Sequence, residues 1–155
     1  MRCYFYGEVK GADQLAKQPG IVSFAVPDFG IIFRSRWEGN LIECQYAALL
    51  SLLQFIETNE KLFKGKNIEI YSDASVVIYQ LTKGTFIFKQ IESYYRLVQV
   101  YKNKFTLNFR WIPEQDNPAH HGLFGTPPIK PTVEINYSIK KSENNSGRVG
   151  GVLPM

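Results

Sequence analysis

The stretch NIEIYSDASVVIYQLTKG, residues 67–84, decides the fold because a strand pattern changes into a helix pattern at one acidic residue. Residues 67–72 form a short β run, and the residues after Asp73 have helical spacing that ends at Gly84. Asp73 therefore stands at the carboxyl end of a strand, where open α/β sheets carry their functional groups. An aspartate in this place could instead cap the helix that follows it, and the sequence leaves both roles open.

The residues before this stretch predict three strands and one long helix. Strand patterns cover residues 3–10, 21–26 and 29–35, and the last two runs predict a hairpin. The loop before them, residues 11–20, is expected to turn at its last two residues, Pro19 and Gly20. Apolar residues recur at helical spacing over residues 41–63, with Asn40 as the expected N-cap.

The residues after the stretch 67–84 predict a further helix over 89–102 and a fifth strand over 105–112, followed by a last helical turn. From residue 125 the chain is rich in Pro, Gly, Ser and Asn, which predicts a flexible tail with one transient strand at 133–139. Residues 1–124 are expected to form one domain. The element order predicts an α/β fold, in which an antiparallel three-strand meander and two parallel strands make a mixed five-stranded sheet flanked by helices.

The amino-acid composition indicates a folded protein with a single domain. A chain of 155 residues with 45% hydrophobic residues should fold as one domain, and its net charge of +4 suits a polyanionic partner. Cys3 and Cys44 are too few for a disulfide framework, so we expect reduced thiols in a cytoplasmic protein. The sequence shows no signal peptide, no membrane span, no phosphate-binding loop and no Cys-rich zinc pattern.

Glu43 is the second acidic residue in a special place. It lies in the first turn of the long helix beside the apolar residues Ile42 and Tyr46, so we expect it to face inward. A carboxylate directed toward a core needs hydrogen bonds or a cation, or it becomes protonated. The alternative is an ordinary acid that the helix dipole favours at this end.

Four segments together resemble the ribonuclease H family. They are CYFYG (residues 3–7), GNLIECQYAALLSLLQFI (residues 39–56), IEIYSDASVVIYQL (residues 68–81) and FRWIPEQDNPAHHGLF (residues 109–124). The resemblance spans about residues 3–124, and the order and spacing of the segments match throughout.

The resemblance implies a fold, an activity and a metal site. In this family four carboxylates hold two divalent cations, Mg²⁺ or Mn²⁺, about 4 Å apart, and the enzyme cuts the RNA strand of RNA–DNA hybrids. Glu43 and Asp73 would be the second and third of these carboxylates. The implied partner is nucleic acid, either an RNA–DNA hybrid or another duplex, with no membrane involved.

The sequence departs from the family at the other two carboxylates. Tyr6 stands at the first position, and Glu8 points to the same face of the strand, so Glu8 could substitute or could simply be solvated. The family spacing Asn-x-x-Ala-Asp-x-Leu places His121 at the fourth position, whereas the shorter Asn-Pro-Ala-Asp places His120 there. Histidine binds Mn²⁺ more readily than Mg²⁺, but the two histidines could also be surface residues of a decayed motif.

Two functional hypotheses follow. The first is a divalent-metal-dependent endonuclease of RNA in RNA–DNA hybrids with a weakened metal site made by Glu43, Asp73, one of the histidines and Glu8. The second is a catalytically inactive module that binds nucleic acid or a protein partner. Four basic residues are candidates for phosphate contacts, although scattered cations also commonly form a solvated helix face; they are Lys83, Lys89, Arg96 and Arg110.

Overall fold

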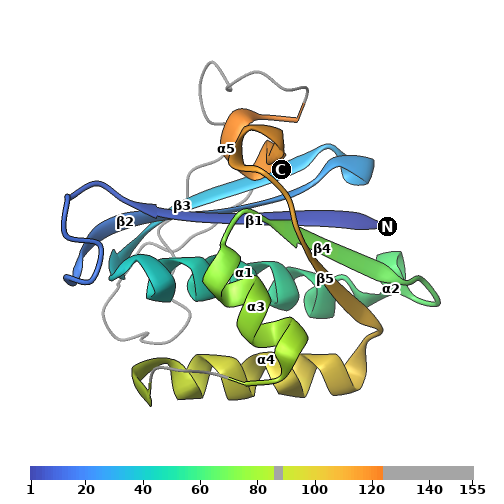
Figure 1. Cartoon of the computed structure of the whole chain (residues 1–155). Helices are drawn as coiled ribbons and strands as arrows, with labels where there is room; N and C mark the ends of the chain where they lie inside the picture. The colour runs from blue at the N-terminus through green and yellow to red at the C-terminus, as the bar shows by residue number, and fades with distance from the viewer. Residues whose placement is uncertain (86–88, 124–155) are drawn as a thin grey trace.

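The computed structural model describes residues 1–85 and 89–123, which fold around one five-stranded sheet (Figure 1). The strand order is β3-β2-β1-β4-β5, with antiparallel pairing among β1, β2 and β3 and parallel pairing of β4 with β1 and β5. This confirms the predicted meander with two added parallel strands. The strands are β1 (Arg2–Val9), β2 (Gln18–Val26), β3 (Ile31–Gly39), β4 (Ile68–Ser72) and β5 (Leu107–Trp111).

Helices lie on both faces of the sheet. Figure 1 shows α1, α3 and α4 below it and the short α5 above it. The predicted tail, residues 125–155, lies outside the described residues. The α-helices are α1 (Leu41–Thr58), α2 (Glu60–Phe63), α3 (Ser75–Lys83), α4 (Glu92–Lys104) and α5 (Pro118–His121), and the 3₁₀ turns are η1 (Pro27–Phe29), η2 (Lys89–Ile91) and η3 (Glu114–Asp116).

The predicted N-cap of the long helix is confirmed. The Asn40 side-chain oxygen accepts a hydrogen bond from the Glu43 amide, and Glu43 Oε1 accepts one from the Asn40 amide, both at 2.9 Å. This reciprocal pair is a capping box, which satisfies two backbone donors at the start of α1. The helix is nevertheless shorter than predicted, because it ends at Thr58 and a separate turn, α2, follows Asn59.

The predicted turn at Pro19 and Gly20 is wrong. Both residues lie inside β2, where Gly20 is paired with Val9 and Trp37. A Cβ on Gly20 would come within 2.6 Å of the Cys44 sulfur, so the missing side chain allows β2 to continue beneath α1. The glycine of this Pro-Gly pair therefore permits close packing against α1 and does not mark a turn.

The core fills the space between the sheet and α1. The two cysteines belong to it as free thiols, and burial raises the pKa of Cys3 and that of Cys44 to about 12, which keeps both protonated. Within residues 1–85 and 89–123, no helix combines the length and hydrophobicity needed to cross a bilayer.

At Gly7 the backbone of α1 packs directly against the sheet. A Cβ there would lie 2.7 Å from the backbone nitrogen of Gln45 and 2.8 Å from the carbonyl oxygen of Cys44. Backbone atoms cannot rotate away, so α1 or β1 would have to shift. Gly7 therefore sets the distance between α1 and the strand that carries Tyr6.

We predict that Gly7→Ala lowers the free energy of unfolding by about 2–3 kcal/mol through this overpacking. Urea unfolding followed by circular dichroism measures the change. Gly11→Ala is the control, since its Cβ would meet only the end of the flexible Gln18 side chain and should cost less than about 1 kcal/mol. Equal losses in the two variants would contradict this account of the packing.

Candidate functional site

The candidate site lies where α5 rests on the sheet face opposite α1. The Ser23 hydroxyl of β2 donates a 2.6 Å hydrogen bond to the carbonyl oxygen of Ala119, and Arg34 of β3 donates a 3.4 Å bond to that of His120. Tyr6 of β1 is paired with Ser23 in the sheet, so its side chain projects toward α5 as well. The short helix is thus held over the centre of the meander.

Tyr6 and His120 occupy this corner together. Their rings are stacked, with centroids 4.1 Å apart and planes 6° from parallel, and the Tyr6 hydroxyl donates a 2.8 Å hydrogen bond to Glu8 Oε1. Burial raises the pKa of Tyr6 well above its ordinary value, and the hydrogen bond to Glu8 raises it further. Negative charge on Asp73 and Glu114 acts in the same direction, which places both carboxylates near a phenol that stays neutral.

Asp73 is held by the buried side chain of Asn117. The Asn117 amide donates to Asp73 Oδ1 at 2.8 Å and to the Phe5 carbonyl at 2.9 Å, while its oxygen accepts from the Ala119 amide at 3.0 Å. The alternative role of Asp73 as the cap of α3 is wrong. The N-cap residue is Ala74, and the hydroxyl of Ser72 accepts its amide hydrogen.

Glu43 lies at the start of α1 and its carboxylate takes part in the capping box. It is half-buried, so it is neither a core residue nor a fully solvated one. Burial and the negative charge of Glu43 raise the pKa of Tyr94 to about 12, which places the carboxylate near α4. The structure therefore gives Glu43 and Asp73 different hydrogen-bond partners, Asn40 and Asn117, and a cation shared by the two acids stays a prediction.

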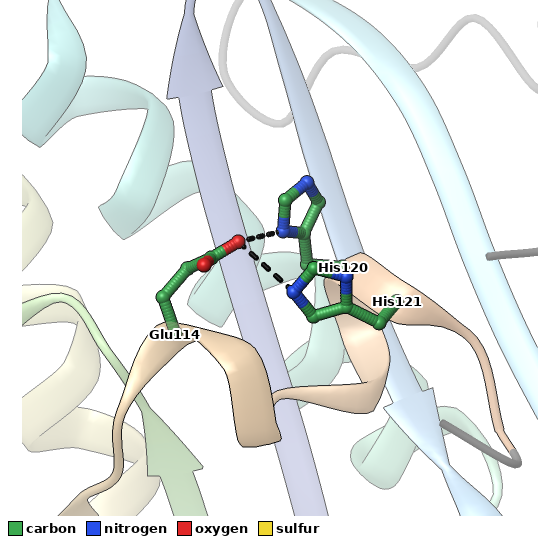
Figure 2. A group of neighbouring side chains, drawn as sticks. All are labelled: Glu114, His120 and His121. Atoms are coloured by element: carbon green, nitrogen blue, oxygen red, sulfur yellow. Dashed lines mark ion pairs between the residues drawn. The ribbon is translucent and has the colours of Figure 1, made fainter. Parts of the chain in front are cut away.

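Figure 2 shows that the side chains of Glu114, His120 and His121 gather at this corner. His121 Nε2 lies 3.1 Å from Glu114 Oε2, and His120 Nδ1 contacts the same oxygen. The two imidazole rings have centroids 4.2 Å apart. Glu8 borders the group, with Oε1 4.0 Å from His120 Nε2.

Glu114 was missed by the sequence analysis. It follows Pro113 in the turn after β5, and no motif marks it. In the sequence it is marked only by its position, six residues before His120. That spacing matters because η3 and α5 fold back on each other. The structure thus brings His120, His121 and Glu114 together with Glu8 at their edge.

The four predicted phosphate-binding residues do not share one surface. Lys83 ends α3 and Lys89 begins η2, both exposed, while Arg96 on α4 forms an ion pair with Glu92 at 2.6 Å. Arg110 is exposed on β5.

Of these four residues, Arg110 lies on the same sheet face as α5. It pairs in register with Tyr71 of β4, and the Tyr71 ring stacks on that of Tyr4 with centroids 5.3 Å apart. Tyr4 and Tyr6 are two residues apart on β1 and therefore share a face. The cation and the two rings are thus neighbours on the sheet face that carries α5.

Comparisons with known proteins show similarity in structure alone. No protein-family model matches the sequence, and no curated protein is significantly similar to it. The solved structure of LC11-RNase H1, isolated from compost by a metagenomic approach, has a TM-score of 0.64 at 15% identity and covers 75% of this chain and 86% of its own. The chain has the ribonuclease H-like fold. This confirms the fold that the sequence resemblance implied.

Other ribonuclease H structures agree. LC11-RNase H1 in complex with an RNA/DNA hybrid has a TM-score of 0.60 at 16% identity, covering 75% of this chain and 87% of its own. RNase H1 from the halophilic archaeon Halobacterium salinarum has a TM-score of 0.62 at 17% identity, covering 76% of this chain and 89% of its own. At such identities the ribonuclease H-like fold is shared, and the chemistry has to be argued from this chain's own residues.

We predict that Asn117→Ala lowers the free energy of unfolding by about 3 kcal/mol, because it leaves the buried Ala119 amide without its partner and removes the hydrogen bonds from Asn117 to Phe5 and Asp73. Urea unfolding gives the value. Asn108→Ala, on the exposed part of β5, is the control and should stay within about 0.5 kcal/mol of the parent. A loss at Asn117 no larger than that at Asn108 would show that this amide is not a structural link.

Proposed function

We propose that this protein is a ribonuclease H-like module that binds nucleic acid, with RNA–DNA hybrid as the first substrate class to test, and that does not carry out two-metal hydrolysis. The observation that carries the proposal is the Tyr6–His120 stack. By the family resemblance Tyr6 stands at the first carboxylate position, and His120 is one of the two candidates for the fourth.

The stack removes what the two-metal mechanism needs. That mechanism depends on anionic oxygen ligands that neutralise two closely spaced cations and hold them on either side of the reacting phosphate. A neutral Tyr6 offers no such charge. Its face-to-face contact with His120 favours His120 over His121 as the residue at the fourth carboxylate position of the family pattern. With two of the four negative charges gone, Mg²⁺ would be held weakly.

The remaining two carboxylates have structural partners. Glu43 closes the capping box of α1, and Asp73 accepts the Asn117 amide. These bonds give each acid a reason to be present without a cation. They support a module in which the fold is retained and the hydrolytic centre is not.

Nucleic-acid binding is supported by the sheet face that carries α5. Arg110 stands beside the stacked Tyr4 and Tyr71, which combines a cation for phosphate with aromatic rings for bases or sugars. The chain also has a net charge of +4. LC11-RNase H1, a protein of the same fold, has been crystallised with an RNA/DNA hybrid.

The second candidate is a divalent-metal-dependent endonuclease of RNA in RNA–DNA hybrids. The gathering of Glu8, Glu114, His120 and His121 favours it, because these side chains supply metal ligands near Asp73. Nitrogen donors suit Mn²⁺ better than Mg²⁺, so any such activity should depend on Mn²⁺.

One experiment separates the two candidates. The protein is mixed with a fluorescently labelled RNA–DNA hybrid, binding is measured by anisotropy, and cleavage is followed on denaturing gels in Mg²⁺ and then in Mn²⁺. We predict binding without cleavage in either metal. If the protein cleaves the hybrid and Asp73→Asn abolishes that cleavage, the endonuclease replaces this proposal. If the protein binds neither hybrid, duplex nor single strands, nucleic acid is not its partner.

We predict that Arg110→Ala weakens hybrid binding several-fold and lowers the salt dependence of log K by about one unit of slope, as expected for one lost phosphate contact. Anisotropy titrations at several salt concentrations measure both quantities. Arg96→Ala is the matched control, since Arg96 is engaged by Glu92 on the helical side of the sheet. If both variants bind like the parent, the sheet face that carries α5 is not the contact surface.

A further inference from the structure

We infer that Glu114, His120 and His121 form a binding site for one transition-metal dication of the Zn²⁺ class, built without Glu43 or Asp73 (Figure 2). The site goes beyond the proposed function, because it requires neither hybrid binding nor hydrolysis. It adds a ligand, Glu114, that the ribonuclease H resemblance does not supply.

The three ligand atoms are already close together. One carboxylate oxygen and one nitrogen from each ring lie within 4.8 Å of one another, and both rings are directed at Glu114 Oε2. Zinc bonds to nitrogen and carboxylate oxygen are about 2.0–2.2 Å long, so small side-chain rotations would let three such atoms surround one ion. Each of the three side chains is partly exposed.

The backbone fixes this arrangement before any ion binds. The backbone N–H of Asn117 donates to the backbone carbonyl of Glu114 at 3.1 Å. The backbone N–H groups of His120 and His121 both donate to the backbone carbonyl of Asn117 at 3.0 Å. The side chain of Asn117 anchors the same turn to β1. The ligands therefore come from one short, internally bonded segment, so binding needs little ordering of the chain.

In the part of the chain that the structure describes, the ring nitrogens that face Glu114 lack hydrogen-bond partners. His120 Nδ1 and His121 Nε2 are buried atoms, and among the described residues neither has an aligned hydrogen-bond partner, although both face the same carboxylate oxygen. A metal ion bonds an imidazole through the lone pair of one ring nitrogen. The two rings, with centroids 4.2 Å apart, each turn one nitrogen toward the same side, where one ion could lie. A single dication satisfies both nitrogens and the carboxylate.

The donor set selects the kind of metal. Two imidazole nitrogens and one carboxylate are typical ligands for Zn²⁺, Co²⁺, Ni²⁺ and related ions, whereas Mg²⁺ and Ca²⁺ prefer oxygen alone. Three protein ligands also leave at least one coordination position for water or an anionic oxygen. The expected ion is therefore of the Zn²⁺ class, in an open site.

Neighbouring residues orient the first histidine. The Tyr6 ring lies flat against His120, and Glu8 Oε1 is 4.0 Å from its second nitrogen, Nε2. At that distance Glu8 makes no hydrogen bond to the ring, but its negative charge favours a cation beside His120. Tyr6 also holds Glu8 through the hydrogen bond from its hydroxyl. By the resemblance Tyr6 stands in place of a family carboxylate, and here it positions His120, a ligand of the proposed site.

The test uses the untagged full chain after treatment with a chelator. Zn²⁺ is titrated by calorimetry, and Co²⁺ is titrated by visible absorption, which reports the ligands around the ion. We predict one ion per chain, a rise in melting temperature with Zn²⁺, and at least a tenfold weaker affinity in Glu114→Gln and in His121→Gln. Asp116→Asn, an exposed acid in the same turn, is the matched control and should bind like the parent.

Two results would overturn the inference. The first is no binding of Zn²⁺ or Co²⁺ by the folded parent chain up to about 1 mM, a concentration that corresponds to roughly 4 kcal/mol of binding free energy. The second is binding that Glu114→Gln and His121→Gln leave unchanged while Asp73→Asn and Glu43→Gln abolish it, which would place the ion at the two family carboxylates. Circular dichroism of each variant verifies that it is folded.

Discussion

The buried amide of Asn117 is the link on which the candidate site depends. It joins the backbone of β1 at Phe5, the carboxylate of Asp73 after β4, and the first turn of α5 at Ala119. Because these are three separate parts of the chain, a single side chain fixes where α5 begins above the sheet. The positions of both histidines follow from that starting point.

This constraint explains why Tyr6 and His120 meet at the corner. Asn117 places His120 directly over β1, and an aromatic ring there is best covered by another flat ring, which Tyr6 provides. The same turn also brings Glu114 back toward the histidines, so nitrogen and oxygen ligands gather beside the stacked pair.

The fold could be predicted from sequence because local patterns agree with it. Alternation in β1 and β4, helical spacing after Asn40, and the strand-to-helix change at Asp73 each follow from nearby residues alone. Gly20 could not be read in the same way, since its role depends on the sulfur of Cys44, which lies far away in sequence. The break after Thr58 was missed because apolar residues continue through Phe63.

The candidate site was predictable only in part, for a related physical reason. Motif spacing marked Glu43, Asp73 and the two histidines, but it could not choose between His120 and His121. Which ring meets Tyr6 depends on the turn of α5, and the part played by Glu114 depends on η3 folding against it. Contacts of this kind arise from the closure of a loop, and no period in the sequence records them.

The most direct measurement is the gain of cleavage when carboxylates are introduced at the aromatic pair. Tyr6→Asp/His120→Asp and the parent chain are compared on the same labelled RNA–DNA hybrid in Mg²⁺, after both are shown to be folded. If the stack is what removed the two-metal centre, the double variant cuts the RNA strand and the parent does not. Cleavage by the parent that is lost in the double variant would contradict this account, because Tyr6 and His120 would then belong to a working active site.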